Sequence, residues 1–178
     1  MTASRRSGPA PRMLRGLVAL CAVAAPIAAL AVTDASAAGA STPPCETSGL
    51  VIWMNTQGNG TAGTIFYTLN FTNLSGHTCT LRGFPGVSAT RLNGSQLGKP
   101  GNRDTGQTVK TITINNGRTA HATLGIVDIG ALPNCPPTTA AGLRVFAPNQ
   151  TRAQFIPFPF SACSRSGPKY LSVRVVTH

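Results

Sequence analysis

The stretch of sequence at residues 65–87, IFYTLNFTNLSGHTCTLRGFPGV, constrains the fold more than any other part of the chain. Its first part alternates, because apolar side chains occupy every second position: Ile65, Tyr67, Leu69 and Phe71. Thr68, Asn70 and Thr72 lie between them, a pattern typical of a strand that buries one face. Turn residues follow at 73–76, and Cys79 then begins a second strand. The stretch predicts a central strand, a turn and a further strand to which the rest of the chain pairs.

Composition favours β structure throughout the chain. Of its 178 residues, 42% are hydrophobic and only 11% are charged, with 19 Gly and 14 Pro. Only four residues are acidic, which leaves no room for helix faces built from Glu and Lys pairs. This composition predicts one all-β, turn-rich domain.

Residues 1–37 have the pattern of a secretory signal peptide. A basic region contains Arg5, Arg6, Arg12 and Arg15. An apolar run at 14–32 and the small-x-small motif that ends at Ala37 follow it, so we expect cleavage after Ala37. An uncleaved membrane anchor is the alternative, but residues 17–32 are fewer than the roughly 20 that a span needs. We therefore expect a secreted, extracellular protein with no stable membrane anchor, a flexible leader at 38–44 and a single domain at 45–178.

Cleavage leaves an even number of cysteines in a basic domain. The remaining chain has eleven Lys and Arg residues against three acids, a net charge of +8. Its four cysteines are Cys45, Cys79, Cys135 and Cys163. In an exported domain they indicate two disulfides, for which three connectivities exist. We favour Cys45–Cys79 and Cys135–Cys163, because each pair joins neighbours in sequence and ties a terminal or loop segment to a strand. A zinc site is the alternative, but the sequence has no Cys-x₂-Cys pair.

Further strands are expected along the whole domain. A first strand at 50–54 is apolar on both faces, which predicts a central or covered position, and 56–63 is expected to be a loop. Asn93-Gly94 and Asn116-Gly117 each predict a hairpin, the first with a type I′ turn and the second joining 111–114 to 119–128. The remaining predicted strands are 87–92, 96–97, 143–147, an edge strand at 154–160 and 170–177, with loops at 99–107 and 132–142. About eight or nine short strands predict an antiparallel two-sheet β-sandwich, immunoglobulin-like, with two disulfides.

Part of this pattern resembles a known family. Cys45, the run at 67–73 and the run TCTLRGFPGV at 78–87 are similar to the domain-of-unknown-function family 4232 of secreted actinobacterial proteins. The later strands, Cys135 and Cys163 fit as well, so the resemblance covers residues 45–176. It implies an exported, disulfide-bonded β-sandwich whose biochemical role is not established, and it transfers no catalytic residue.

No catalytic, metal or cofactor site is predicted. The candidate members of a Ser-His-Asp site are His77, His121, Asp104 and Asp128, but no Gly-x-Ser-x-Gly motif accompanies them. Glycosidase chemistry needs two carboxylates that flank a bond, and the only acids after cleavage, Glu46, Asp104 and Asp128, all lie in expected loops or strand ends. The scattered His residues and Met54 give no metal-ligand spacing. We expect a protein that is not an enzyme, with a secreted hydrolase as an alternative.

Binding is the more open class of function. The positive charge favours anionic extracellular polymers, although the basic residues could simply keep the surface soluble. They are Arg82, Arg91, Lys99, Arg103, Lys110, Arg118, Arg144, Arg152, Arg165, Lys169 and Arg174. A one-faced patch could form from those near turns, Arg82, Lys110 and Arg118, whereas a platform for specific nucleic-acid binding is not evident.

Aromatic residues offer another binding mode. Trp53 is the only Trp and is expected in the core between the sheets, although stacking on carbohydrate is the alternative. Phe155, Phe158 and Phe160 surround two prolines in the predicted edge strand, which could pair with a partner's strand. The sequence thus predicts an exported, non-enzymatic β-sandwich that binds a cell-envelope component or a protein partner; adhesion to anionic polymer is the alternative.

Overall fold

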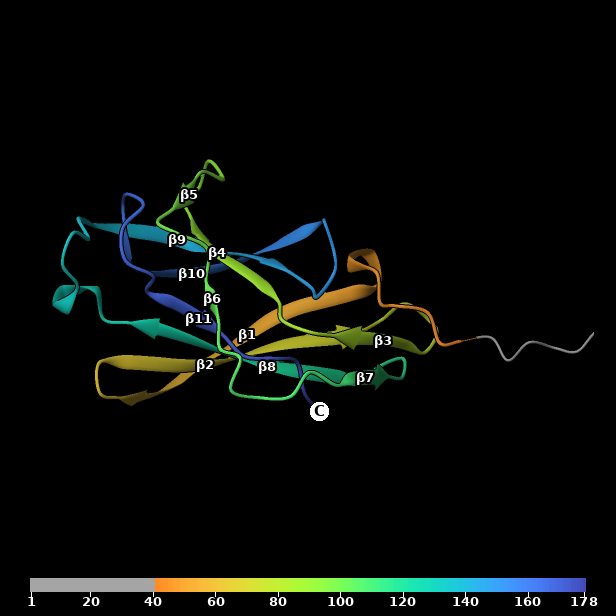
Figure 1. Ribbon diagram of the computed structural model, residues 1–178. Helices are drawn as coiled ribbons and strands as arrows, with labels where there is room; N and C mark the ends of the chain where they lie inside the picture. Colours follow the sequence, from red (N-terminus) through yellow and green to blue (C-terminus); the bar gives the residue numbers. More distant parts are fainter. Residues whose placement is uncertain (1–40) are drawn as a thin grey trace, which may run out of the picture. The chain divides into compact units, whose positions relative to one another are not determined.

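Residues 41–178 are described by the computed structural model of the chain, shown in Figure 1. The predicted signal peptide, residues 1–37, and the start of the predicted leader lie outside these residues. Within the described residues no helix is long and apolar enough to cross a membrane.

Two antiparallel layers and a short ribbon make up the described residues (Figure 1). The first sheet has the order β1 (Leu50–Thr61), β2 (Thr64–Asn73), β8 (Thr119–Val127), β11 (Leu171–Val173) and β6 (Asn102–Arg103), and only the β11–β6 pair is parallel. The second sheet has the order β10 (Ala153–Cys163), β9 (Pro137–Phe146), β4 (Gly86–Thr90) and β5 (Gln96–Leu97). β3 (Cys79–Arg82) and β7 (Thr111–Ile114) form the ribbon. Two 3₁₀ turns, η1 (Thr47–Gly49) and η2 (Ile129–Ala131), complete the elements of residues 41–178. The predicted all-β class is confirmed.

The core lies between the two sheets. Leu69 and Phe71 of β2 and Leu143 and Val145 of β9 have no exposed surface and belong to one apolar cluster. Burying each such side chain stabilises the fold by about 1.5–3 kcal/mol. Gln154 of β10 adds a polar link between the layers, because its side chain donates to the carbonyl of Leu50 at 2.6 Å and accepts from the N–H of Ile52 at 3.0 Å. The arrangement is sandwich-like, as predicted.

The alternating stretch forms the centre of the first sheet. β2 pairs with β1 along one side and with β8 along the other, so the predicted central strand is confirmed. The chain then leaves this sheet at Asn73, and Cys79 begins β3 in the separate ribbon. β8 is also oriented as expected, with Ala120 and Leu124 buried and His121 on the outer side.

The prediction for the first strand was wrong in two respects. β1 lies at the edge of its sheet, and Val51 and Trp53 are each 46% exposed. The predicted loop at 56–63 is instead the second half of β1 and its turn to β2, where Ala62 and Gly63 both have positive φ as a type I′ turn requires. Main-chain pairing with β2 holds this polar, Gly-containing half as a strand although none of its side chains is buried.

Only one of the two predicted hairpins exists. β4 and β5 pair around Asn93-Gly94, but only Gly94 has positive φ, so the turn is not type I′. β7 and β8 do not pair with each other, because β7 pairs with β3 in the ribbon and β8 with β2 and β11 in the first sheet. The turn at Gly117 instead connects the ribbon to the first sheet. The N–H of Gly117 donates to the Asn73 carbonyl at 2.7 Å.

Several boundaries also differ from the predictions. The loop expected at 132–142 ends at Pro137, where β9 begins, since proline is tolerated as the first residue of a strand. The loop expected at 99–107 contains the exposed two-residue strand β6. The edge position of β10 agrees with the prediction.

Both predicted disulfides are present. Cys45 is bonded to Cys79 and Cys135 to Cys163, and all four residues are buried. The N–H of Thr80 donates to the carbonyl of Pro43 at 2.9 Å, so ordered pairing extends into the segment expected to be a leader. The two bonds indicate that the domain folds in an oxidising environment.

Candidate functional site

The outer face of the first sheet gathers polar and aromatic side chains in rows across three strands. The strand register places residues of β1, β2 and β8 directly opposite one another on this face. We call it the Trp53 face, and its members are Val51, Trp53, Asn55, Thr68, Asn70, Thr72, Thr119, His121 and Thr123. The alternate residues of the same strands point into the core, which fixes the direction of the face.

Trp53 is the largest side chain of the Trp53 face. Its indole N–H donates to the Thr72 hydroxyl at 3.1 Å, and that hydroxyl lies 2.9 Å from the hydroxyl of Thr119. The hydrogen bond satisfies the polar end of the indole, while the ring remains 46% exposed on an edge strand. The expectation that Trp53 packs in the core is therefore wrong, and the ring is available for stacking.

Asn70 and His121 form a pair in the same row as Trp53, because Asn70 is opposite Trp53 on one side and His121 on the other. Nδ1 of His121 lies 2.7 Å from Oδ1 of Asn70, and the Asn70 residue is only 3% exposed. The amide nitrogen of Asn70 donates to the carbonyl of Thr68, so its oxygen accepts and the proton of the neutral imidazole is on Nδ1. The pair holds the imidazole in one orientation and leaves Nε2 as its acceptor.

A charged group lies beside this face at the β11 and β6 edge. Nε of Arg174 donates to Oδ2 of Asp104 at 3.0 Å, and its guanidinium lies 5.8 Å from the ring centre of Phe66. The N–H of Gly106 and the Arg174 guanidinium lower the pKa of Asp104 below its ordinary value. Both charged side chains are exposed, so this ion pair contributes little to stability.

The other candidate catalytic residues are spread over the domain. The ring of His77 contacts the carbonyl of Ser75 in the turn before β3, and Asp128 accepts from the N–H of Gly130 at the start of η2. Asp104 is paired with Arg174 and Glu46 precedes η1. Among residues 41–178, neither His77 nor His121 hydrogen-bonds to a carboxylate. The same residues contain no group of three or more His, Cys, Asp or Glu side chains placed to hold a metal ion.

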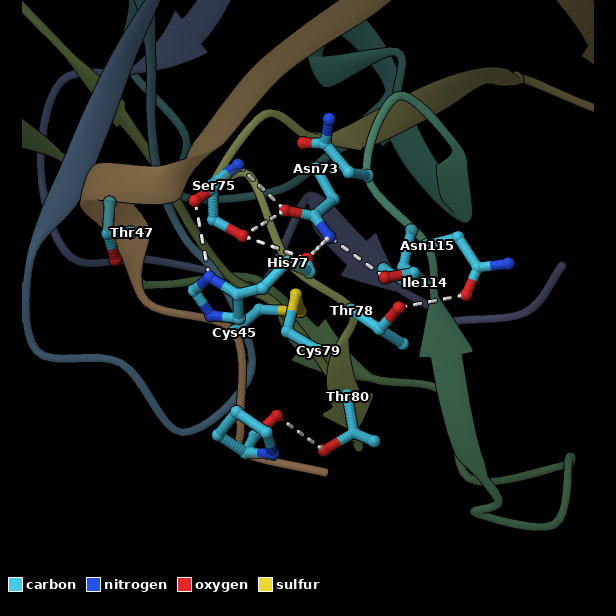
Figure 2. The surroundings of a disulfide bond; sticks show 12 residues. Cys45, Thr47, Asn73, Ser75, His77, Thr78, Cys79, Thr80, Ile114 and Asn115 are labelled. Atoms are coloured by element: carbon cyan, nitrogen blue, oxygen red, sulfur yellow. Dashed lines mark hydrogen bonds between the residues drawn. A yellow bond between two sulfur atoms is a disulfide. The ribbon is translucent and has the colours of Figure 1, made fainter. Parts of the chain in front are cut away.

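The surroundings of the Cys45–Cys79 bond are structural (Figure 2). Asn73 donates from Nδ2 to the carbonyls of His77 at 2.7 Å and Ile114 at 2.8 Å. Its Oδ1 accepts from the N–H and the hydroxyl of Ser75. The polar residues between β2 and Cys79 thus direct the chain into the ribbon, which explains this part of the sequence pattern without a ligand.

The predicted aromatic edge segment is divided between two surfaces. Phe155 is 49% exposed on the outer side of the second sheet. Phe158 packs edge-on against Tyr67, with ring centres 5.1 Å apart, and Phe160 lies 5.8 Å from Phe158. Phe160 and Tyr67 line a cavity of about 450 Å³ beside η2. Only Phe155 therefore remains as an exposed aromatic of this strand.

Arg82, Lys110 and Arg118 do not form the one-faced basic patch that their positions near turns could have produced. Arg82 is opposite Thr111 at the start of β7, next to Lys110, whereas Arg118 lies beyond the other end of β7. Arg103 stacks on Phe84 and Arg144 on Phe146, on different sheets. The positive charge is distributed over both layers.

Residues 50–54 are apolar at every position, and this pattern alone predicts that Trp53 lies in the core. Period-2 alternation puts Val51 and Trp53 on one face but does not say which face is exposed. The signal that could have identified the exposed face lies in the partners, since Thr72 and Asn70 opposite these residues are polar.

Comparison with known proteins gives one match. The model of the DUF4232 family, a domain of unknown function, matches residues 45–177. No curated protein and no solved structure matches the chain. The immunoglobulin-like classification, the actinobacterial source and the secreted nature of such proteins therefore stay predictions.

Proposed function

We propose a function from the premise that the chain belongs to the DUF4232 family, whose model covers residues 45–177. The protein is an exported, non-enzymatic binding domain, and its target is a glycan of the cell envelope. The Trp53 face is the binding surface.

The exposed indole of Trp53 is the observation that carries this proposal. A large aromatic ring that is 46% exposed on a sheet face can stack on the C–H face of a sugar ring. Its N–H is held by Thr72, so the ring has one orientation before any ligand binds. A pre-oriented ring loses little side-chain entropy on binding.

Polar groups around the indole complement the hydroxyls of a glycan. The pair Asn70–His121 presents a ring acceptor in the same row as Trp53, and the exposed Thr68 lies in the next row. A flat surface of this kind suits a linear polymer that lies along the sheet. The imidazole is held by an amide and not by a carboxylate, which favours a binding role over proton transfer.

Export is supported by two independent features. The disulfides Cys45–Cys79 and Cys135–Cys163 require an oxidising compartment. Residues 1–37 carry the sequence pattern of a signal peptide. Together they support a mature protein outside the cytoplasm, where envelope glycans are accessible.

Cosedimentation of the purified protein with purified cell wall tests the proposal. We expect wild type to bind and Trp53→Ala to lose at least about tenfold in affinity, which corresponds to about 1.4 kcal/mol. Leu74→Ala is the matched control, because Leu74 is a 58% exposed apolar residue outside the Trp53 face. Wild-type affinity in Trp53→Ala would contradict the proposal.

A salt series separates stacking from charge-driven adhesion. Stacking and neutral hydrogen bonds persist as ionic strength rises, whereas adhesion of a +8 domain to an anionic polymer is screened. Binding that is lost entirely at about 1 M salt, where the Debye length is about 3 Å, would favour adhesion to anionic polymer instead.

A further inference from the structure

A second, smaller pocket lies on the outer face of the other sheet. It has a volume of about 220 Å³ and is lined by Thr90, Arg91, Leu92, Gly94, Arg144 and Phe155. The strand register places Thr90 opposite Gly142 and Phe155 opposite Arg144, so β4, the β4–β5 turn, β9 and β10 all contribute to it. The Trp53 face is on the first sheet, so the two sites are separate.

Two buried polar groups beside this pocket have no partner among residues 41–178. Thr90 is 1% exposed, and its hydroxyl makes no hydrogen bond to any described residue. Nε of Arg144 is likewise buried and without an acceptor. Buried polar groups in folded proteins are nearly always paired, so two such groups at one small pocket indicate a place for a ligand atom.

The charge of the pocket is positive and uncompensated. Arg91 and Arg144 line it, and its lining includes no Asp or Glu. In the described part of the chain the one salt bridge joins Arg174 to Asp104, on the other sheet. Nη2 of Arg144 donates to Oε1 of Gln96 at 3.1 Å, which leaves most of the donors of its guanidinium for an acceptor of another molecule.

Phe155 gives the pocket an apolar wall. Its side chain is 49% exposed, and its ring lies close to Gly142, where a Cβ atom would come within 2.9 Å of the ring. The same Cβ would also collide with the carbonyl of Ile156. Glycine at this position therefore lets the ring lie against the sheet beside Thr90 and Arg144.

We propose that this pocket binds the carboxylate of an acidic sugar. A planar carboxylate matches the fork of donors on arginine, and the Thr90 hydroxyl supplies one further hydrogen bond. The ring of Phe155 covers the C–H face of the sugar. The volume is below the roughly 300–1,000 Å³ of pockets for drug-sized ligands, which suits a single acidic residue of a glycan. Binding requires the lining side chains to move apart. Arg144 is held by one hydrogen bond to Gln96 and by its contact with the ring of Phe146.

Titration of the ¹⁵N-labelled protein with glucuronate, followed by NMR, tests this site. We expect shifts at Thr90, Arg91 and Arg144, and a Kd raised at least about tenfold in Arg144→Gln. Arg91→Gln, at an exposed position in the turn, is expected to weaken binding without disturbing the fold. Arg103→Gln is the control, because Arg103 is an exposed arginine on β6 of the first sheet.

Other ligands define the chemistry of the site. Glucose, which lacks the carboxylate, is expected not to bind, and acetate, which lacks the ring, is expected to bind more weakly than glucuronate. Three results would overturn the assignment to an acidic sugar. They are glucose binding as tightly as glucuronate, acetate binding as tightly as glucuronate, and inorganic phosphate binding more tightly than glucuronate. A glucuronate affinity unchanged in both Arg144→Gln and Arg91→Gln would also overturn it.

The two proposals fail independently. Trp53→Ala is expected to bind glucuronate with wild-type affinity, because Trp53 lies on the other sheet. Loss of wall binding in Trp53→Ala with intact glucuronate binding would support both sites. Loss of glucuronate binding in Trp53→Ala would contradict the separate pocket.

Discussion

Asn73 shows how one side chain directs the path of the main chain. Asn73 has no exposed surface, and its side chain makes four hydrogen bonds at the point where β2 ends (Figure 2). Its position after an alternating strand identified it as a turn residue from sequence alone. Its partner Ile114 is 41 residues away, and local patterns carry no information about such a distant carbonyl.

Replacing Asn73 with Ala should destabilise the domain by roughly 3 kcal/mol, because the Ile114 carbonyl loses a buried donor and the His77 carbonyl loses one of its two donors. Urea unfolding with the disulfides intact measures the change in the free energy of unfolding. Asn93→Ala is the control, since Asn93 is exposed and its side chain accepts only from the N–H of Ser95. Equal losses in the two variants would show that the buried network is not important.

Because Tyr170 is buried, we expect the domain to lose stability at alkaline pH. Burial raises the pKa of its hydroxyl to about 12, and the hydroxyl donates to the carbonyl of Leu97 at 3.1 Å. The pKa of Tyr170 in the folded state exceeds its unfolded value of about 10. The contribution of the protonated hydroxyl to the free energy of unfolding is therefore complete below pH 10 and is lost as the pH rises toward 12.

In Tyr170→Phe the decline in stability between pH 10 and 12 should become shallower, while stability at pH 7 falls by about 1 kcal/mol because the hydrogen bond is lost. Chemical unfolding at a series of pH values measures both effects. Tyr67→Phe is the control and should keep the wild-type slope. A slope unchanged by Tyr170→Phe would mean that other groups cause the alkaline loss.

At the scale of elements, alternation predicted strands well where one face is buried. The apolar residues predicted to face inward on β8 are all buried, as are Leu69 and Phe71 of β2, whereas Ile65 at the start of β2 is 44% exposed. The second half of β1 has no buried residue, and main-chain pairing alone makes it a strand, so side-chain patterns could not find it.

The pairing of each strand with its neighbours was harder to predict than the position of the strands in the sequence. The Asn116-Gly117 signal predicted a turn correctly, yet β7 and β8 separate into the ribbon and the first sheet. A turn signal specifies the local reversal of the chain and not the strand that pairs next. The hydrogen bond from Gly117 to Asn73 depends on contacts between distant segments.

The edge strand β10 is protected by its prolines. Pro157 and Pro159 lie in this strand and supply no N–H group that a strand of another molecule could use. Replacing both with Thr should increase concentration-dependent association, which analytical ultracentrifugation measures.

A double substitution of two prolines outside the strands is the control for the double substitution in β10. Pro100→Thr and Pro148→Thr replace prolines outside the strands and should leave the protein at its wild-type association state. Unchanged association after the Pro157→Thr and Pro159→Thr double substitution would show that the prolines do not protect the edge.

At the scale of the whole domain, two disulfides and two packed sheets create a rigid support for exposed faces. The cysteine pairing could be predicted because each bond joins cysteines near in sequence, with separations of 34 and 28 residues. The binding surfaces could not be predicted in the same way. The Trp53 face and the small pocket lined by Thr90, Arg144 and Phe155 each combine residues from three or more separated segments, which only the register brings together.

The central claim is that the Trp53 face binds a cell-envelope glycan. The most direct test is NMR mapping of the labelled protein with soluble fragments of purified cell-wall glycan, with the Trp53 indole N–H as a separate reporter. We expect shifts of that indole signal and of amides in β1, β2 and β8 around Asn70 and His121. An unshifted indole, with the perturbed amides confined to the ribbon or the second sheet, would contradict it.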